Sequence, residues 1–359
     1  MRLLIIGAGP AGLSSAYWSL KNGHEVLVFE KDSKYNKVCG EAVPKQVFDL
    51  TPLKPKPPVI CNEVKGYHIY FNGKHYKEIK SHLVGYILNK EVFINELEKA
   101  VEDEGGRILH RVKIVDLDHL RGKVIDHKGN AYSGDLIVDA GGHFSLTQRK
   151  KILNFKSYKV APAAQCRCKV VDFEFHDPEK IHLNYYKDGY SWIFYKSEEL
   201  VNLGLGRLRG NVKKELEEKL KSGNFIRVGD IKVDLVSIGG LIETFTRGKL
   251  RVAGEAAGMV FPHTGEGIRP AIYAGKLVFK GSYEKEFRKG LGKRIQRGKH
   301  FNKLLLEQFT EADFKELISV VDEKLAEKLF HCEKLLFNLK MLTKLKLLFK
   351  FIPMFFKAR

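Results

Sequence analysis

The chain begins MRLLIIGAGPAG (residues 1–12), an apolar run that leads into three closely spaced glycines. Residues 2–6 predict a short buried strand, and residues 10–22 predict a helix directly after the glycines. Residues 25–29 predict a second strand, so a strand, a helix and a strand fit into the first 30 residues. This order is typical of the opening of a doubly wound, Rossmann-like α/β sheet.

The glycines follow the pattern G-x-G-x-x-G, in which each glycine has its own task. The first permits a tight turn, the second lets the backbone approach a pyrophosphate, and the third lets helix and strand pack closely. The pyrophosphate would lie on the free N–H groups at the helix N-terminus. Glu30 ends the second strand, 18 residues after Gly12, where a carboxylate binds a ribose diol. The pattern predicts a dinucleotide site made of Gly7, Gly9, Pro10, Ala11, Gly12, Glu30 and Lys31.

Length and composition exclude several classes of protein. The 359 residues, 44% of them hydrophobic, suffice for about two domains and exclude a disordered chain. Five cysteines are too few for a disulfide framework and indicate a reducing compartment, hence a cytoplasmic protein. Residues 3–20 are uncharged and mimic a signal peptide or membrane span, but the Gly-Pro break at Gly9 argues against both.

Hydrophobic periodicity predicts the remaining elements. The sequence indicates a β-hairpin over 64–79 with its turn at Asn72-Gly73, and an amphipathic helix over 90–104. The pattern also predicts a proline-rich loop over 51–58, strands near 107–117, 122–127, 136–138 and 249–253, a strand-rich region over 158–206, and helices from about 265 and from 284 onward.

A second glycine-rich segment lies near residue 254. Leu250–Gly258, Pro262 and Gly265–Ile268 form a strand, a turn with an acid, and a helix start. This segment resembles the second flavin motif of the p-hydroxybenzoate-hydroxylase-like flavoproteins. The resemblance implies FAD as cofactor, with the acid on the ribityl chain and the helix start at the isoalloxazine O2 region. It implies cofactor contacts by Gly254, Glu255, Pro262, Gly265, Glu266, Gly267 and Ile268.

Two further segments narrow the resemblance to the geranylgeranyl reductase family, most closely its archaeal membrane-lipid branch. Lys37–Glu41 is similar to that family's Cys-Gly segment. Tyr190–Tyr195, followed after eight residues by Gly204-Leu205-Gly206, is similar to its pocket motif Y-x-W-x-F-P-x8-G-x-G. Aromatic hydroxylases and halogenases lack this motif. The chain departs from the family's pattern at Asn89 (usually Arg), Gly141 (usually Asp), Tyr195 (usually Pro) and Glu255 (usually Asp).

The resemblance implies FAD-dependent reduction of isolated C=C bonds in polyprenyl (geranylgeranyl) chains of membrane lipids or their precursors. Hydride would come from reduced flavin N5, with NAD(P)H or another reductant as electron donor. The candidate catalytic residues are Cys39, Gly40 and Glu41, and Cys39 is also a candidate flavin contact. The candidate substrate-binding residues are Tyr190, Trp192, Phe194, Gly204 and Gly206.

Several of these residues have a simpler interpretation. The three rings of Tyr190, Trp192 and Phe194 alternate on a strand and share one face, which suits an apolar tunnel or an ordinary core. Cys39 suits a small buried residue as well as a functional one. His263 could lie near the flavin edge, but a loop histidine is more often solvated. Cys166-x-Cys168 has no partner pair, and we predict no metal site.

The net charge of +19 points to an anionic partner. Residues 334–359 contain seven basic residues, no acidic one, and large apolar residues at helical spacing. This pattern predicts an interfacial helix that holds the protein on the inner face of the cell membrane, or a helix packed on its own domain. No RNA-binding motif with interleaved aromatics is present, so we predict no nucleic-acid partner. The oligomeric state is left open, a monomer included.

We predict three parts. The FAD-binding domain comprises 1–60, 83–157 and 245–284, the antiparallel-sheet substrate domain comprises 61–82 and 158–244, and the helical C-terminal region comprises 285–359.

Two other functions stay open on this fold. One is a flavin monooxygenase or halogenase, and the other is a non-catalytic flavin- or lipid-binding protein.

Overall fold

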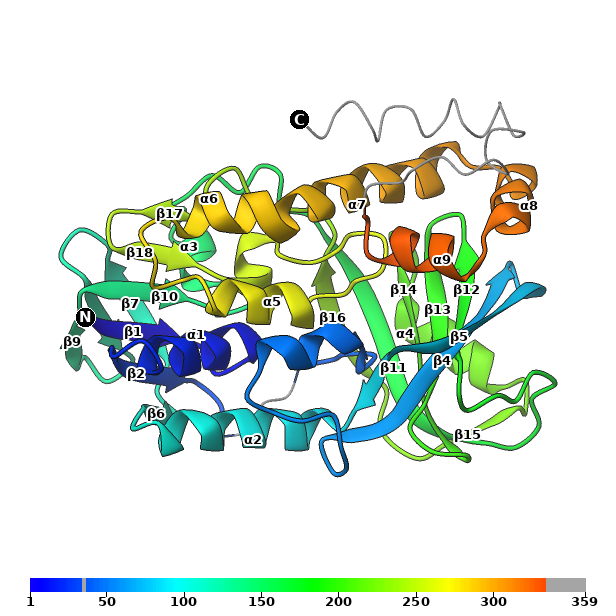
Figure 1. Ribbon diagram of the computed structural model, residues 1–359, viewed down its shortest axis with the longest axis horizontal. Helices are drawn as coiled ribbons and strands as arrows, with labels where there is room; N and C mark the ends of the chain where they lie inside the picture. Colours follow the sequence, from blue (N-terminus) through cyan, green and yellow to red (C-terminus); the bar gives the residue numbers. More distant parts are fainter. Residues whose placement is uncertain (34–36, 334–359) are drawn as a thin grey trace.

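The computed structural model, which describes residues 1–33 and 37–333, has two large sheets at opposite ends of an elongated molecule (Figure 1). The first sheet has six strands in the order β17-β18-β10-β1-β2-β6, and all neighbours except β17 and β18 run parallel. Its strands are β1 (Arg2–Ile6), β2 (Glu25–Glu30), β6 (Arg107–His110), β10 (Leu136–Asp139), β17 (Thr246–Arg247) and β18 (Leu250–Val252). The predicted doubly wound α/β start is confirmed.

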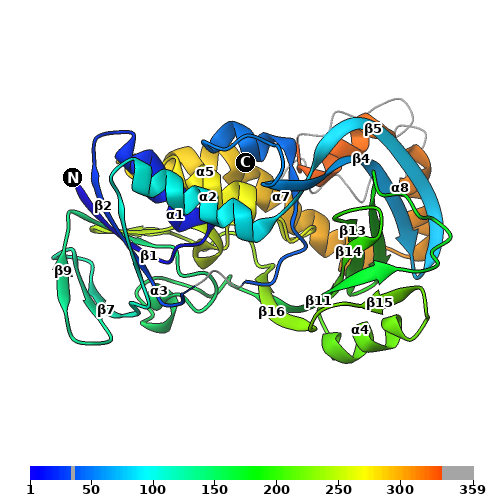
Figure 2. The same cartoon turned by 90° about the horizontal axis from the view of Figure 1, so that it is seen from below.

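Three helices cover one face of this sheet: α1 (Pro10–Leu20), α2 (Lys90–Asp103) and α5 (Ile268–Gly275). Figure 2 shows them on one side and α3 (Leu146–Arg149) on the other. α1 and α5 pack closely, and the Ser14 hydroxyl donates to the Ile272 carbonyl at 2.8 Å. The N-terminal fingerprint and the second glycine-rich segment therefore lie side by side, although about 250 residues separate them.

The second sheet has nine strands in the order β15-β11-β14-β13-β12-β4-β5-β3, with β16 also paired to β11. The predicted hairpin is confirmed as β4 and β5, with Asn72 and Gly73 at positive φ in the turn, but both strands extend beyond 64–79. The strands are β3 (Ala42–Pro44), β4 (Ile60–Phe71), β5 (Lys74–Leu88), β11 (Val160–Val170), β12 (Ile181–Tyr186), β13 (Gly189–Tyr195), β14 (Leu200–Arg207), β15 (Phe225–Arg227) and β16 (Lys232–Ser237).

A small sheet of β7 (Ile114–Asp118), β8 (Lys123–Asp126) and β9 (Ala131–Ser133) packs beside the first sheet. The sequence predicted one strand near 107–117, and this prediction is wrong. Arg111 adopts a φ of 59°, so the chain turns between β6 and β7, and the two strands join different sheets. α4 (Val212–Leu220) packs on the far end of the nine-stranded sheet.

The C-terminal part is helical, as predicted, as far as Phe330. A long helical segment runs from α6 (Tyr283–Phe287) through α7 (Lys293–Lys303) and spans both sheets, with π-turns at Arg288–Gly292 and Leu304–Gln308 (Figure 1). α8 (Glu311–Val320) and α9 (Glu323–Phe330) then cover β4 and β5, where Phe314 packs against Phe71 and Phe330 stacks on Tyr67 at 4.4 Å. The predicted interfacial helix at 334–359 lies outside the described residues.

In the part of the chain that the structure describes, no helix combines the length and apolarity that a transmembrane span needs.

The other face of the nine-stranded sheet carries a cluster of neutral imidazoles. His68 and His182 stack at 4.6 Å, His68 Nδ1 lies 3.1 Å from His75 Nε2, and the Tyr70 hydroxyl lies 3.0 Å from His182 Nδ1. Burial lowers the pKa of all three histidines, that of His182 to about 3. The folded protein therefore disfavours a proton on His182, although Asp177 partly opposes this shift.

This cluster makes stability depend on pH. Between the ordinary pKa of 6.5 and about 3, unfolded chains bind a proton at His182 and the folded protein does not, so stability falls as the pH falls below 6.5. One such group contributes a slope of at most about 1.4 kcal/mol per pH unit. We expect His182→Asn, which keeps an acceptor for Tyr70, to flatten the pH dependence in urea titrations from pH 7 to pH 4. The same substitution at exposed His82 is the control, and an equal effect of both variants would contradict this explanation.

Candidate functional site

The turn after β1 leaves no room for a side chain at Gly7 or Gly12. Gly7 has a φ of 101°, and its N–H donates to the Phe29 carbonyl at 2.8 Å. A Cβ on Gly7 would lie 2.7 Å from the Ala140 carbonyl oxygen, and one on Gly12 would lie 1.8 Å from that of Gly7. Because α1 begins at Pro10, its free N–H groups follow this turn directly.

Glu30 links the end of β2 to the same turn. One carboxylate oxygen accepts from the Ala8 N–H at 2.8 Å, and the other accepts from the Asp32 N–H at 3.0 Å. Each oxygen keeps a further lone pair, because an ionised carboxylate accepts about four hydrogen bonds. The geometry therefore holds Glu30 in place and leaves it able to accept from a diol.

Glu255 lies on the 3₁₀ turn after β18, Gly254–Ala257. Its Oε1 accepts from the Ser237 N–H at 2.9 Å, and its Oε2 is ion-paired with Lys37. Burial lowers the pKa of Lys37 to about 8, and the nearby carboxylate of Asp234 works against that shift. Lys37 was not among the predicted site residues, although it is the first residue of the segment that resembles the family's Cys-Gly segment.

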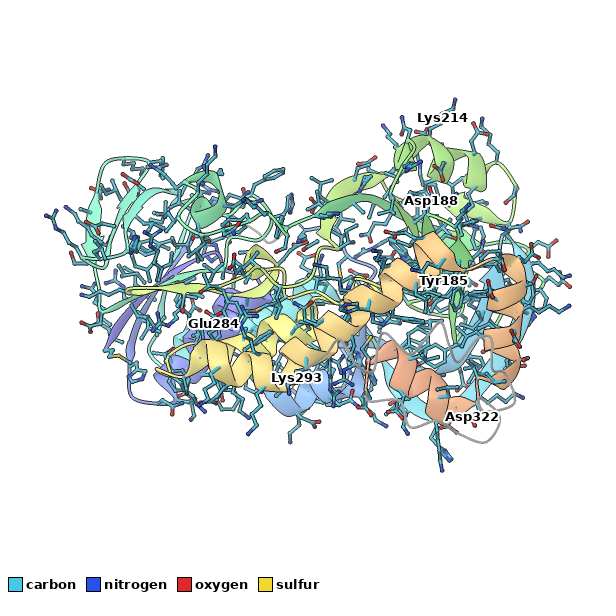
Figure 3. The ribbon with its side chains drawn as sticks, turned by 90° about the horizontal axis from the view of Figure 1, so that it is seen from above. Tyr185, Asp188, Lys214, Glu284, Lys293 and Asp322 are labelled. Atoms are coloured by element: carbon cyan, nitrogen blue, oxygen red, sulfur yellow. The ribbon has the colours of Figure 1, made fainter. Side chains whose placement is uncertain are left out.

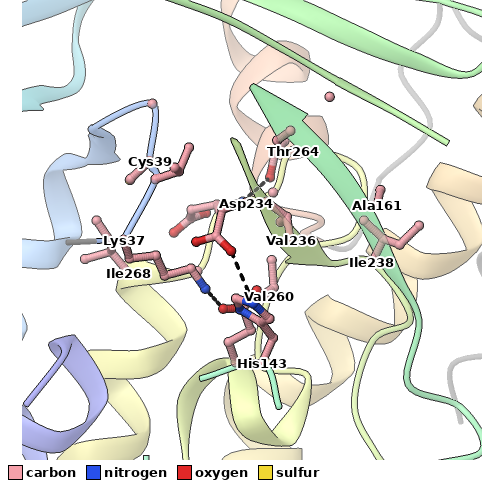
Figure 4. Close-up of a pocket in the computed structure, with 18 of the residues that line it drawn as sticks. Lys37, Cys39, His143, Ala161, Asp234, Val236, Ile238, Val260, Thr264 and Ile268 are labelled. Atoms are coloured by element: carbon pink, nitrogen blue, oxygen red, sulfur yellow. Dashed lines mark hydrogen bonds and ion pairs between the residues drawn. The ribbon is translucent and has the colours of Figure 1, made fainter. Parts of the chain in front are cut away.

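Asp234 and His143 form a second polar pair close to Lys37 (Figure 4). His143 Nε2 lies 3.2 Å from Asp234 Oδ1. Burial and the Lys37 charge lower the pKa of His143, while Asp234 raises it. Lys37, Glu255, His143 and Asp234 all line the cavity. The sequence prediction missed both residues because they come from a loop and a strand that only the fold brings together.

The loop before α5 presents backbone to the cavity. Gly265 adopts a φ of 68°, and α5 begins at Ile268. The Glu266 carboxylate is held by two hydrogen bonds of 2.8 Å from Arg269. Burial raises the pKa of Glu266, and Arg269 opposes this change. Glu266 therefore stabilises the loop through its ion pair with Arg269 and is one of the residues that line the cavity.

His263, in the same loop, is buried. Its Nε2 lies 3.1 Å from the Phe330 carbonyl oxygen, and the Cys332 sulfur lies 3.5 Å from that nitrogen. Burial lowers its pKa to about 4. The alternative of a solvated loop histidine is therefore wrong, because α9 ends against the loop and covers it.

The segment Cys39–Glu41 crosses from the first sheet to the second. The Asn202 side chain donates to the Cys39 carbonyl at 3.1 Å and accepts from Trp192 Nε1 at 2.9 Å. The Glu41 N–H donates to the Cys39 sulfur at 3.3 Å. A Cβ on Gly40 would lie 2.8 Å from the Phe194 ring. The segment thus packs directly on the aromatic strand β13.

Glu41 is the residue that anchors this crossing. It adopts a left-handed φ of 71°, and its carbonyl accepts from the Leu88 N–H at 2.9 Å. Its carboxylate forms a buried ion pair with Lys196, whose ammonium also donates to the Leu88 carbonyl at 2.9 Å. The sequence analysis missed Lys196 and Asn202, because both lie at unspecified positions of the pocket motif.

The aromatic row of β13 faces one side, as the alternation predicted. The Tyr190 and Trp192 rings are 5.8 Å apart, and those of Trp192 and Phe194 are 6.1 Å apart. The Tyr190 hydroxyl donates to the Thr264 carbonyl at 2.5 Å, next to the loop before α5. The row therefore starts at the second glycine-rich segment and ends at Gly40.

A single cavity of about 910 Å³ connects these features, near the upper end of the usual range for ligand sites. It begins at the turn after β1, passes the Lys37–Glu255 pair, and ends between β13 and the C-terminal helices. The predicted residues that line it are Gly7, Gly9, Pro10, Ala11, Glu30, Lys31, Cys39, Gly40, Glu41, Tyr190, Trp192, Phe194, Gly206, Glu255, Pro262, Gly265, Glu266, Gly267 and Ile268.

Three predicted residues lie behind this wall and make room for neighbours. A Cβ on Gly204 would lie 2.2 Å from the Trp192 ring, and one on Gly254 would lie 2.7 Å from the Ala11 Cβ. Gly12 has the contact with Gly7 described above. The ligand contacts predicted for Gly12, Gly204 and Gly254 stay predictions. In the structure each of these glycines lets a neighbouring group pack closely against the backbone.

Comparison with known proteins supports the same fold. Residues 5–52 match the NAD(P)-binding Rossmann-like domain family. The digeranylgeranylglycerophospholipid reductase of Methanococcus aeolicus is 26% identical and aligns over 90% of this chain and 91% of its own length. The resemblance predicted from the sequence motifs is thus confirmed over most of the chain.

Two solved structures share the architecture. A geranylgeranyl bacteriochlorophyll reductase-like protein from Thermoplasma acidophilum is 21% identical, with a TM-score of 0.78 over 92% of this chain and 94% of that one. A flavin-dependent brominase is 18% identical, with a TM-score of 0.69 over 92% and 94%. At these identities the likeness shows the fold.

The residues present fit a flavin dinucleotide. The turn after β1 provides helix N–H groups and a surface without side chains for a pyrophosphate. Glu30 retains acceptor capacity at one end, and Glu255 places a buried carboxylate farther along the same cavity. No protein group other than Lys37 is bound to Glu255 Oε2 among the contacts of the described residues.

The Glu41–Lys196 pair gives a stability prediction. Removing one partner of a buried ion pair leaves the other charge uncompensated and costs about 3–5 kcal/mol. We expect Glu41→Gln to lower the free energy of unfolding by about this amount in urea titrations. Adding Lys196→Met to that variant should restore part of the loss.

The exposed Lys65–Glu179 pair is the matched control, because exposed pairs contribute about 0.2–1 kcal/mol. If Glu41→Gln costs no more than Glu179→Gln, then Glu41 does not anchor the crossing.

Proposed function

We propose that this protein is an FAD-dependent reductase of isolated C=C bonds in the polyprenyl chains of membrane lipids or their precursors. The observation that carries the proposal is the single cavity, which joins a dinucleotide-type site to an aromatic-lined compartment. The similarity to digeranylgeranylglycerophospholipid reductases over most of the chain supports the same substrate class.

The far compartment suits a hydrocarbon. Tyr67, Phe71 and Tyr185 line it from the nine-stranded sheet, and Phe309 and Phe314 line it from the C-terminal segment. These rings exclude water and provide no charge, so a long apolar chain gains free energy by leaving water, at about 25 cal/mol per Å² of buried apolar surface. The aromatic row of β13 lines this cavity. Under the proposed function, the row therefore forms part of an apolar tunnel for the substrate.

When bound, reduced FAD supplies a hydride for one alkene carbon, and the other carbon takes a proton. Cys39 holds a thiol at the cavity wall, between the first glycine-rich turn and the aromatic row. Asn202 and Glu41 fix the backbone on both sides of this thiol. We assign Cys39 to shaping the site or assisting the proton transfer, and Gly40 and Glu41 to positioning it. The electron donor is a nicotinamide or another reductant.

We also propose that the segment 334–359 contacts the membrane surface. The basis is its sequence alone, which combines basic residues with apolar residues at helical spacing.

Glu30 and Glu255 test the cofactor site. Loss of hydrogen bonds to a charged group costs about 1.5–3 kcal/mol, so Glu30→Gln and Glu255→Gln should each weaken FAD binding roughly 10- to 100-fold. Flavin fluorescence titration of the apoprotein measures this. Glu63→Gln, at an exposed position of β4, should bind FAD like the wild type. Equal affinity of all variants would show that the flavin lies elsewhere.

The reaction itself is tested with dithionite-reduced protein and an unsaturated archaeal-type lipid. Mass spectrometry should show a gain of two hydrogens for each reduced double bond. A protein that binds FAD but leaves the lipid unchanged would favour the non-catalytic alternative. Fast oxygen-dependent NAD(P)H consumption would favour a monooxygenase or halogenase, whose fold this chain shares.

A further inference from the structure

Two large apolar side chains are exposed at the edge of the cavity. Phe144 is 59% exposed and Leu208 is 42% exposed, and both line the cavity. They come from opposite sides of it, Phe144 from the loop after β10 and Leu208 from the end of β14. Exposed apolar residues that border an apolar pocket indicate an interaction site more strongly than scattered ones do.

The loop around Phe144 is ordered and holds this ring outward. Phe144 adopts a φ of 58°, a left-handed conformation that is strained for a bulky residue. Its N–H donates to the Gln148 side chain at 3.0 Å, and its carbonyl accepts from Arg149 Nε at 3.1 Å. The Phe144 ring packs edge-on against His143 at 5.1 Å and still leaves more than half of its surface exposed, so the loop presents an apolar ring to solvent.

Hydrogen bonds and ion pairs also fix the backbone around Leu208, on the other side of the cavity. The Leu208 N–H donates to the Asp188 carbonyl at 2.8 Å. Arg207 is ion-paired with Asp188 and Glu215 and stacks on the Tyr186 ring at 3.9 Å. Leu208 and exposed Arg209 follow directly. Here too an exposed apolar side chain lies beside a cation.

We define the entrance rim as Lys113, Phe144, Arg149, Leu208 and Arg209. Its three cations are exposed, and the acid nearest to Leu208, Asp188, is neutralised by Arg207. α3, which follows Phe144, and α4, which follows Arg209, lie on the same side of the molecule (Figure 2). Asp188 lies toward this side as well (Figure 3). Apolar side chains flanked by cations are typical of surfaces that enter the headgroup region of anionic bilayers.

We propose that the entrance rim docks on an anionic lipid bilayer, with Phe144 and Leu208 inserted at the headgroup boundary. The cavity then opens onto the acyl region, and a lipid chain passes between bilayer and cavity without crossing water. This inference rests on the proposed function, because that function requires a substrate drawn from a membrane. The net charge of +19 provides the long-range attraction.

The test is flotation of the full-length holoprotein with vesicles of phosphatidylglycerol and phosphatidylcholine that contain no polyprenyl lipid. Replacing both inserted side chains by serine removes the apolar surface that leaves water when the rim docks. We expect Phe144→Ser with Leu208→Ser to lower the partition coefficient at least about tenfold. The matched control is Leu120→Ser, at a position 72% exposed in the turn between β7 and β8, and it should float like the wild type.

Flavin content and thermal unfolding of each variant show whether it is folded. The proposal is overturned if the wild type does not float, if the double variant floats as the wild type does, or if Leu120→Ser loses as much binding. Equal binding to vesicles of phosphatidylcholine alone would overturn the role of the cations. Unchanged flotation of the double variant would assign the contact to another segment, 334–359 included. Because these vesicles hold no substrate, the result is independent of lipid reduction, which is measured with detergent-dispersed lipid.

Discussion

The buried ion pair between Glu41 and Lys196 holds the end of the crossing segment against the nine-stranded sheet. Glu41 ends the segment that leaves the first sheet, and Lys196 ends the strand that carries the aromatic row. Both side chains are less than 8% exposed, so neither charge has water as an alternative partner. The pair therefore fixes where Cys39 and Gly40 lie against Trp192 and Phe194. The position of the cavity between the sheets depends on this arrangement.

The lining of the cavity changes along its length, from backbone and polar side chains at one end to aromatic rings at the other. At the dinucleotide end, glycines leave the backbone uncovered, and carboxylates mark the two places where hydroxyl groups can bind. In the middle, the Lys37–Glu255 and Asp234–His143 pairs hold charge in a partly buried wall. At the far end, aromatic rings from the sheet and the C-terminal segment form an uncharged compartment. This gradient from polar to apolar suits a polar cofactor next to a hydrocarbon.

The C-terminal helices, which belong to neither sheet, form part of the wall of the cavity. α8 and α9 cover β4 and β5 through Phe314 and Phe330, and the Phe330 carbonyl lies 3.1 Å from His263 Nε2. The loop of the second glycine-rich segment is thereby held from both sides, by Tyr190 and by α9. This explains why His263 is buried, although its sequence neighbours are proline, threonine and glycine.

Local sequence determined the strand–helix–strand start, the hairpin turn at Asn72-Gly73, helix α2 and the shared face of the β13 rings, because each depends on neighbouring residues or on a period of two or 3.6. Most of the site residues that the motifs identified line the cavity. Only the tertiary structure decided that β6 and β7 separate at Arg111, that Lys37, His143 and Asp234 meet, and that Lys196 and Asn202 anchor the Cys39 segment. The physical reason is that these contacts join residues up to about 200 positions apart, and a charge or amide becomes a partner only when burial removes water from both.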